Sequence, residues 1–239
     1  ADKVYSLTQT KTQVDVFLDE FLATELQRAT VVDPSYQQML AIMQSYLAAG
    51  GKHLRPHLAI LTYQGYGGQK TPDILPVASA WELLHAALLV HDDIIDRDDM
   101  RHGALNIFGR YCEVYNQAAS INIEHYALSS ALLAGDLLIS YSQQIVLNAK
   151  LDADAKVAIL QLLNEAIFMV GGGELLDAES VLYPLDATNA RTIALYKTAG
   201  YTFQLPLLSG AVLAGVDGDD LRSIRKIAEK HGISFQLVD

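Results

Sequence analysis

Residues 76–96 read PVASAWELLHAALLVHDDIID, a nearly unbroken apolar run that ends in three aspartates. A helix that is apolar around its circumference must be surrounded by other helices. Elsewhere in the chain, apolar residues recur at intervals of three and four, which is the period of helices that bury one face. We therefore expect an all-α protein in which about ten helices form a single bundle around this central helix.

The length and composition favour one large domain. The 239 residues are 51% hydrophobic, which is enough to bury a sizeable core, and no low-complexity tract or charged linker marks a boundary. Residues 1–239 are therefore expected to form one domain. The final residues, ISFQLVD at 233–239, read as the first turns of a further helix, so this domain is expected to lack its C-terminal helices.

The charge balance and the cysteine content argue against several classes of protein. Lys and Arg total 17 against 28 Asp and Glu, a net charge of −11, which argues against nucleic-acid or anionic-membrane partners. The only cysteine, Cys112, cannot form an internal disulfide, and the N-terminus lacks a secretion signal, so we expect a cytoplasmic protein. Glu82 and His85 interrupt the longest apolar run before the roughly 20 residues that a bilayer span needs, so no transmembrane segment is expected.

An acidic run follows the apolar stretch. Residues 91–103 read HDDIIDRDDMRHG, with five carboxylates in eight residues. On a helix, Asp92 and Asp96 lie one turn apart and Asp93 lies about 100° round from Asp92, so their oxygens can converge. Because like charges one turn apart repel, and because oxygen ligands suit a hard divalent ion, this run indicates a Mg²⁺ site. A solvated acidic helix end is the alternative for this segment taken alone.

Basic residues lie in separate places along the chain. Lys52 and Arg55 are three apart in GGKHLRP at 50–56, beside a flexible glycine pair, and two cations on one side of a turn can bind phosphate oxygens. An ordinary solvated loop is the alternative for this segment taken alone. Further candidates for anion binding are Arg101, His102, Lys197 and Thr198. Together, the carboxylates, the basic residues and the apolar helical walls indicate a site for a diphosphate attached to a hydrocarbon tail.

On these motifs the chain strongly resembles the trans-isoprenyl diphosphate synthases, or polyprenyl synthetases, from about residue 50 to residue 239. The matching motifs are GGKHLRP at 50–56, DDIIDRDDMRHG at 92–103, AGDLL at 134–138, GGGELLD at 171–177, KTA at 197–199 and FQLVD at 235–239. The resemblance implies the isoprenoid synthase fold, with helices around a central apolar cavity. It also implies a homodimer and three Mg²⁺ ions held between two aspartate-rich motifs.

The resemblance implies a role for each residue that matches a family motif. The metal ligands would be Asp92, Asp93, Asp96 and Asp239. The allylic diphosphate would contact Arg101, Lys197 and Gln236, with Thr198 beside Lys197. Isopentenyl diphosphate would be bound by Gly51, Lys52, Arg55, His85 and His102. Asp177 would support the diphosphate site, whereas His85 taken alone reads as a hydrogen-bonded core histidine.

The implied reaction joins isopentenyl diphosphate to an allylic prenyl diphosphate. The allylic diphosphate ionises, the isopentenyl double bond attacks the allylic cation, and a proton is lost. The products would be an all-trans polyprenyl diphosphate and diphosphate. No side-chain nucleophile is needed, because metal and cationic side chains stabilise the leaving group. The catalytic set would be Asp92, Asp93, Asp96, Arg101 and Lys197.

Three positions depart from the family pattern. His102 replaces the second arginine of the RRG motif, His53 replaces an arginine of GGKRLRP, and Glu174 stands where many members have glutamine. The imidazole of His102 is shorter than an arginine side chain and titrates near neutral pH. We therefore expect a weaker affinity for isopentenyl diphosphate.

The floor of the hydrocarbon cavity is expected one to two helical turns before Asp92, at Leu84, Ala87 and Leu88. None of these three residues is aromatic, and in the family bulky aromatic residues at this place tend to stop chain growth early. By this analogy we expect a product of about twenty carbons or more.

Other interpretations stay open. A class I terpene cyclase shares the aspartate-rich chemistry but needs only one diphosphate site. An HD-type phosphohydrolase is suggested by His91 and Asp92, although its imidazole metal ligands fit the motif order poorly. A non-catalytic subunit of a heteromeric prenyl synthase is suggested by His102 and by the missing remainder of the second aspartate-rich motif.

Overall fold

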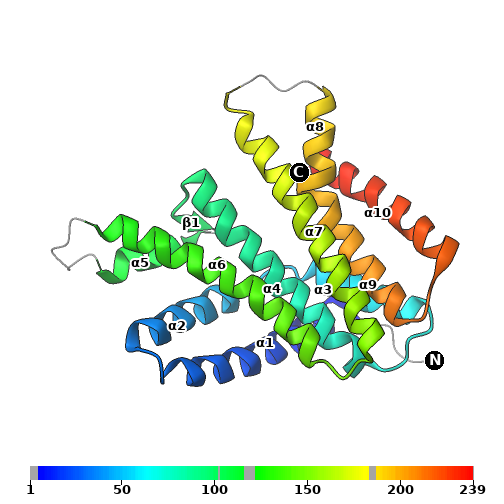
Figure 1. Ribbon diagram of the computed structural model, residues 1–239, viewed down its shortest axis with the longest axis horizontal. Coiled ribbons are helices and arrows are strands. Elements are labelled where there is room, and N and C mark those ends of the chain that lie inside the picture. The colour runs from blue at the N-terminus through cyan, green and yellow to red at the C-terminus, as the bar shows by residue number, and fades with distance from the viewer. Residues whose placement is uncertain (1–4, 102, 116–121, 183–186, 239) are drawn as a thin grey trace. The chain divides into compact units, whose positions relative to one another are not determined.

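The computed structural model confirms the predicted all-α class (Figure 1). It describes residues 5–101, 103–115, 122–182 and 187–238. The helices are α1 (Leu7–Ala29), α2 (Pro34–Ala48), α3 (Leu54–Gly65), α4 (Thr71–Asp96), α5 (Ile107–Tyr115), α6 (Ile123–Asn148), α7 (Ala153–Glu179), α8 (Ala187–Ile193), the π-helix η1 (Ala194–Gln204), α9 (Leu205–Leu213) and α10 (Gly218–Val238). Two short strands, β1 (Met100–Arg101) and β2 (Ala104–Leu105), form an antiparallel hairpin that the sequence did not predict.

Contacts between residues group the chain into two compact units. One unit comprises Ala1–Lys11, His53–Trp81 and Gln143–Asp239, and the other comprises Thr12–Lys52 and Glu82–Ser142. The first unit therefore holds α3, η1, α7, α9 and α10, and the second holds α2, α5, the hairpin and the acidic end of α4. The expectation of one domain over residues 1–239 stays a prediction.

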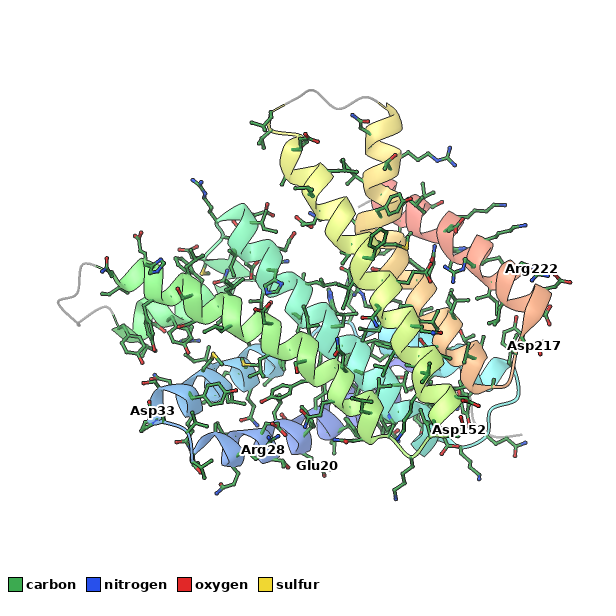
Figure 2. The ribbon with its side chains drawn as sticks, viewed as in Figure 1. Glu20, Arg28, Asp33, Asp152, Asp217 and Arg222 are labelled. Atoms are coloured by element: carbon green, nitrogen blue, oxygen red, sulfur yellow. The ribbon has the colours of Figure 1, made fainter. Side chains whose placement is uncertain are left out.

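Local sequence signals set the ends of several helices. The side chain of Asp33 accepts a hydrogen bond of 2.7 Å from the backbone N of Ser35, so α2 begins where the Asp-Pro pair predicts. Asp152 caps α7 in the same way, with 2.7 Å to the backbone N of Ala155 (Figure 2). Just after the C-terminal end of α4, Arg97 has a left-handed φ of 61°. This residue ends the helix and turns the chain into the hairpin.

The apolar part of α4 is buried, as its composition predicts. Fully buried side chains include Val77, Trp81, Leu83 and Ala87. By length and composition alone, α4 and α7 could each cross a membrane, but 67% of the apolar window of α4 is buried inside the protein, against 22% for α7. The burial of α4 is that of a core helix.

Candidate functional site

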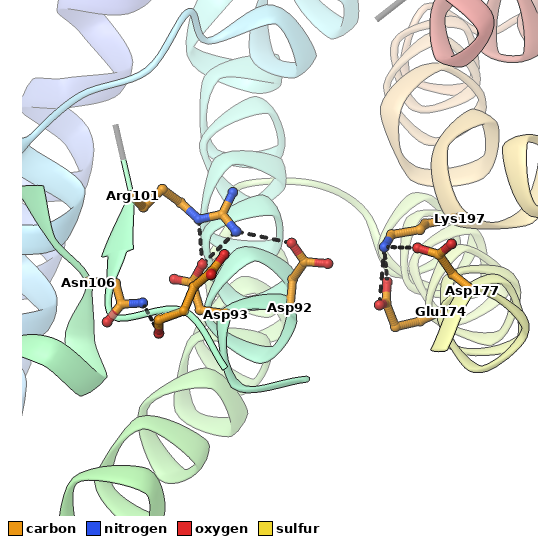
Figure 3. A network of polar contacts seen from close by, with 8 residues as sticks. Asp92, Asp93, Arg101, Asn106, Glu174, Asp177 and Lys197 are labelled. Carbon is orange, nitrogen blue, oxygen red and sulfur yellow. Dashed lines mark hydrogen bonds and ion pairs between the residues drawn. The ribbon is translucent and has the colours of Figure 1, made fainter. Parts of the chain in front are cut away.

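The acidic end of α4 is neutralised by an arginine from the hairpin. Arg101 Nε donates to Asp93 Oδ1 at 2.7 Å, and Arg101 Nη2 donates to Asp92 Oδ2 at 3.0 Å (Figure 3). A second contact joins Nη2 to Asp93 Oδ1 at 2.5 Å. The structure therefore brings together three of the predicted site residues through a single guanidinium.

Burial makes this cluster electrostatically strong. The Asp93 side chain is 3% exposed, whereas those of Asp92 and Arg101 are each 21% exposed. Burial raises the pKa of the Asp93 carboxyl above its ordinary value, and the Arg101 guanidinium opposes that rise by stabilising the carboxylate. Interactions between charges are stronger away from water. The two carboxylates therefore hold the Arg101 guanidinium more firmly than an exposed acidic run would.

Asn106 fixes the hairpin that carries Arg101. Its Nδ2 donates to Asp98 O at 2.7 Å (Figure 3). Its backbone N donates to Asp99 O at 3.0 Å. Its Oδ1 accepts from the backbone N of Gly109 at 2.9 Å, at the start of α5. A Cβ on Gly109 would lie 2.3 Å from Asp99 O, so only glycine permits this approach. Sequence reasoning missed Asn106, although an asparagine just before an apolar helix is a recognised capping signal.

The chemistry of these side chains fits a hard divalent ion. Carboxylate oxygens are the ligands that Mg²⁺ prefers. Within the part of the chain that the structure describes, the buried Asp93 Oδ2 has no hydrogen-bond partner and can therefore accept a ligand contact. Among the described residues, however, no three His, Cys, Asp or Glu side chains converge on one point. Arg101 bridges Asp92 and Asp93, Asp96 is exposed, and Asp239 lies outside the described residues.

Lys197 lies in a second cluster, on η1. Its Nζ donates to Asp177 Oδ2 at 2.7 Å and to Glu174 Oε1 at 3.1 Å, both on α7 (Figure 3). These two acids are three residues apart and so share one face of α7. A Cβ on the neighbouring Gly173 would lie 2.2 Å from the backbone N of Lys197, so a glycine is required for α7 and η1 to pack this closely.

The π-helical geometry of η1 was not predicted. Its wider turn runs over 11 residues and includes Lys197 and the buried Thr198. Helical period alone cannot distinguish a π-helix from an α-helix in so short a segment, and π-helical turns are frequent at functional sites.

Arg55 also meets η1. Its Nη2 donates to Thr202 Oγ1 at 2.7 Å, and its guanidinium lies 4.4 Å from the centre of the Tyr201 ring. Thr202 is buried, and Arg55 Nε is buried with no hydrogen-bond partner in the described ranges of the chain. Sequence reasoning identified Arg55 but not Thr202, because 147 residues separate them in the chain.

The comparisons with known proteins agree with this geometry. The family model described as polyprenyl synthetase matches residues 36–239. The chain belongs to the polyprenyl synthetase family. It is 32% identical over 210 residues to a dimethylallyltranstransferase of Fischerella ambigua, covering 85% of this chain and 56% of that protein. It is 29% identical to a farnesyl diphosphate synthase of Micrococcus luteus, covering 86% of this chain and 66% of the relative.

A solved structure gives the same fold. The geranylgeranyl pyrophosphate synthase of Corynebacterium glutamicum, described as complexed with isoprenyl diphosphate and magnesium, superposes with a TM-score of 0.92 at 26% identity. The match covers 98% of this chain and 67% of that one. The chain spans only about half to two thirds of the length of the curated relatives quoted above, 56% and 66%.

The remaining predicted site residues fall in three groups. Gly51 and Lys52 are exposed and His85 is half-buried. The predicted floor residues occupy one stretch of α4, where Leu84 and Ala87 are buried and Leu88 is half-buried. His102, Asp239 and the side chain of Gln236 lie outside the described residues, so their roles stay predictions.

Proposed function

We propose that this chain condenses isopentenyl diphosphate with an allylic prenyl diphosphate, in the presence of Mg²⁺, to give a longer prenyl diphosphate and diphosphate. The observation that supports this proposal best is the cluster of Asp92, Asp93 and Arg101 at the end of a buried apolar helix. The carboxylate oxygens of this cluster are suited to a hard divalent ion, and the guanidinium can donate two parallel hydrogen bonds to a phosphate group.

The chain's own residues supply charge and position. Arg101 and Lys197 would donate to the oxygens of the allylic diphosphate and stabilise the negative charge that grows as its C–O bond breaks. Arg55 and Lys52 would bind the second diphosphate and so orient the double bond that attacks the allylic cation. Asp92, Asp93 and Asp96 would hold Mg²⁺, which when bound neutralises the leaving diphosphate.

The direct test incubates the purified chain with isopentenyl diphosphate, dimethylallyl or farnesyl diphosphate, and Mg²⁺. Dephosphorylated products are then separated by chromatography. We expect linear prenols that grow by five-carbon units. Cyclic hydrocarbons formed without uptake of labelled isopentenyl diphosphate would support a terpene cyclase instead, and turnover only with a partner chain would support a non-catalytic subunit.

We propose further that the chain acts as a cytoplasmic homodimer. Three large apolar side chains on α6, Leu128, Leu132 and Leu133, are between 40% and 58% exposed. An exposed apolar surface of this kind is typical of a protein interface. The oligomeric state is measured by sedimentation velocity.

The product is proposed to contain about twenty carbons or more, because no aromatic side chain occupies the predicted floor at Leu84, Ala87 and Leu88. Ala87→Phe is expected to shorten the product, since the added ring would fill space below the carboxylates. Ala86→Phe adds the same bulk about 100° round the helix and is the control. Thermal unfolding shows whether each variant folds, because Ala86 and Ala87 are both buried. Identical products from wild type and Ala87→Phe would place the floor elsewhere.

Thr202 is proposed to position Arg55 for isopentenyl diphosphate. Thr202→Val keeps the shape of the side chain and removes the acceptor of the 2.7 Å hydrogen bond. We expect the KM for isopentenyl diphosphate to rise about tenfold, with little change in the KM for the allylic substrate. Thr202→Ser, which keeps the hydroxyl, is expected to restore the KM. Thr62→Val is the matched control, because the hydroxyl of Thr62 donates to Leu58 O of its own helix. An unchanged KM in Thr202→Val would contradict this role.

A further inference from the structure

Arg101 occupies one oxygen of each of two carboxylates that a divalent ion would need. It contacts Asp93 Oδ1 at 2.7 Å and Asp92 Oδ2 at 3.0 Å through two nitrogens of one planar guanidinium. Such a forked contact with two carboxylates is geometrically specific, because the donors have fixed directions. A metal ion bound to the same oxygens would therefore have to compete with Arg101.

The contact is built into the fold and is not a chance encounter of surface side chains. Backbone pairing of Arg101 with Ala104 holds the hairpin, and Asn106 ties the hairpin to the end of α4 through Asp98 O and Asp99 O. The side chain of Asp93 is 3% exposed, so the ion pair is shielded from water and salt.

Removing Arg101 from the carboxylates requires another partner for its charge. A buried carboxylate or guanidinium that loses its partner is strongly unfavourable. A diphosphate supplies such a partner, because phosphate oxygens accept the same forked pair of hydrogen bonds as a carboxylate. Once Arg101 has moved to a diphosphate, Asp92 and Asp93 lose the positive charge that the guanidinium placed beside them, which favours a divalent ion.

We propose that Arg101 couples the two binding events: it withholds Asp92 and Asp93 from a divalent ion until a diphosphate draws the guanidinium away. This inference rests on the proposed function, since it takes a diphosphate as the ligand. Thermodynamic linkage makes the coupling reciprocal, so a bound metal ion also frees Arg101 for the diphosphate. The free chain would thus bind metal weakly and complete its metal site only with substrate present.

The test measures Mn²⁺ binding to the full chain without substrate, by electron paramagnetic resonance of free Mn²⁺. Arg101→Gln removes the competing guanidinium, and we expect Mn²⁺ to bind about tenfold more tightly than to the wild type. Arg97→Gln is the matched control, because it removes the same charge from an exposed residue four positions earlier. We expect it to change the Mn²⁺ affinity by less than about twofold.

A second arm measures inorganic pyrophosphate binding in EDTA by calorimetry. Asp93→Asn is expected to tighten this binding, because it weakens the hold on Arg101, and the gain is expected to vanish in the Asp93→Asn, Arg101→Gln double variant. Circular dichroism checks folding. If Arg101→Gln does not fold, Arg101→Lys decides the first arm, because lysine keeps the charge but lacks the fork that bridges both carboxylates. We then expect tighter Mn²⁺ binding than in the wild type.

Equal Mn²⁺ affinities in Arg101→Gln and Arg97→Gln would overturn the proposal, since a general charge effect would explain both. Weaker Mn²⁺ binding in Arg101→Gln would also overturn it. Neither measurement depends on prenyl transfer. A wild-type chain that turns over while Arg101→Gln binds Mn²⁺ no more tightly would keep the proposed function and reject the coupling.

Discussion

Asp93→Asn is expected to lower kcat/KM for the allylic diphosphate by about a hundredfold or more at saturating Mg²⁺. The substitution keeps the size of the side chain but removes the charge of the buried carboxylate that Arg101 contacts at 2.7 Å. An amide is a poorer ligand for Mg²⁺ than a carboxylate is, so the leaving diphosphate would lose much of its stabilisation. Steady-state kinetics with labelled isopentenyl diphosphate measure this loss.

Asp98→Asn is the matched control for this variant. Asp98 belongs to the same acidic run, but its side chain is exposed beyond the end of α4. We expect its kcat/KM to stay within about twofold of the wild type, because an exposed charge outside the cluster is screened. A similar loss in both variants would mean that the total negative charge matters and that the Asp93 position does not.

Gly173→Ala is expected both to destabilise the fold and to displace Lys197. The new Cβ would lie 2.2 Å from the backbone N of Lys197 and 2.7 Å from its Cα, so α7 and η1 would have to separate. Overpacking of this kind costs about 1–3 kcal/mol of unfolding free energy. Each kcal/mol lowers Tm by about 2–4 °C in a chain of this size. A displaced Lys197 is expected to lower kcat/KM by about tenfold or more.

Gly172→Ala provides a control one residue away on the same helix. A Cβ there would meet no atom within 4 Å, so the substitution adds helix propensity without a clash. We expect a gain of up to about 1 kcal/mol in unfolding free energy and unchanged kinetics. Calorimetric unfolding of the two variants tests the contrast, and equal Tm shifts would contradict the close approach of α7 to η1.

The predictions that the structure confirms depend on short-range patterns in the sequence. The buried state of α4 follows from its apolar composition, and the start of α2 follows from the Asp33-Pro34 pair. The closeness of Arg101 to the acidic run follows from a separation of nine residues or fewer. Motif order along the chain was likewise enough to indicate the family, which the match over residues 36–239 then showed.

The contacts that were missed join residues far apart in the chain or depend on an exact backbone path. Arg55 meets Thr202 across 147 residues. Support for Lys197 from Glu174 and Asp177 was indicated only by the family motif, because helical period says which face a residue occupies but not which helix faces it. The role of Gly173 depends on how closely α7 packs against η1, and no local sequence pattern predicts that distance.

Composition, helical period and motif spacing were sufficient to predict the all-α class and the family, because each is a property of neighbouring residues. The folded chain was needed to show that the cations expected to bind diphosphate, Arg101 and Lys197, are each paired with two carboxylates. The physical reason is that ion pairing depends on distances of a few ångströms between separate elements. Those distances are set by packing, by the hairpin after α4 and by the π-helical turn at Lys197.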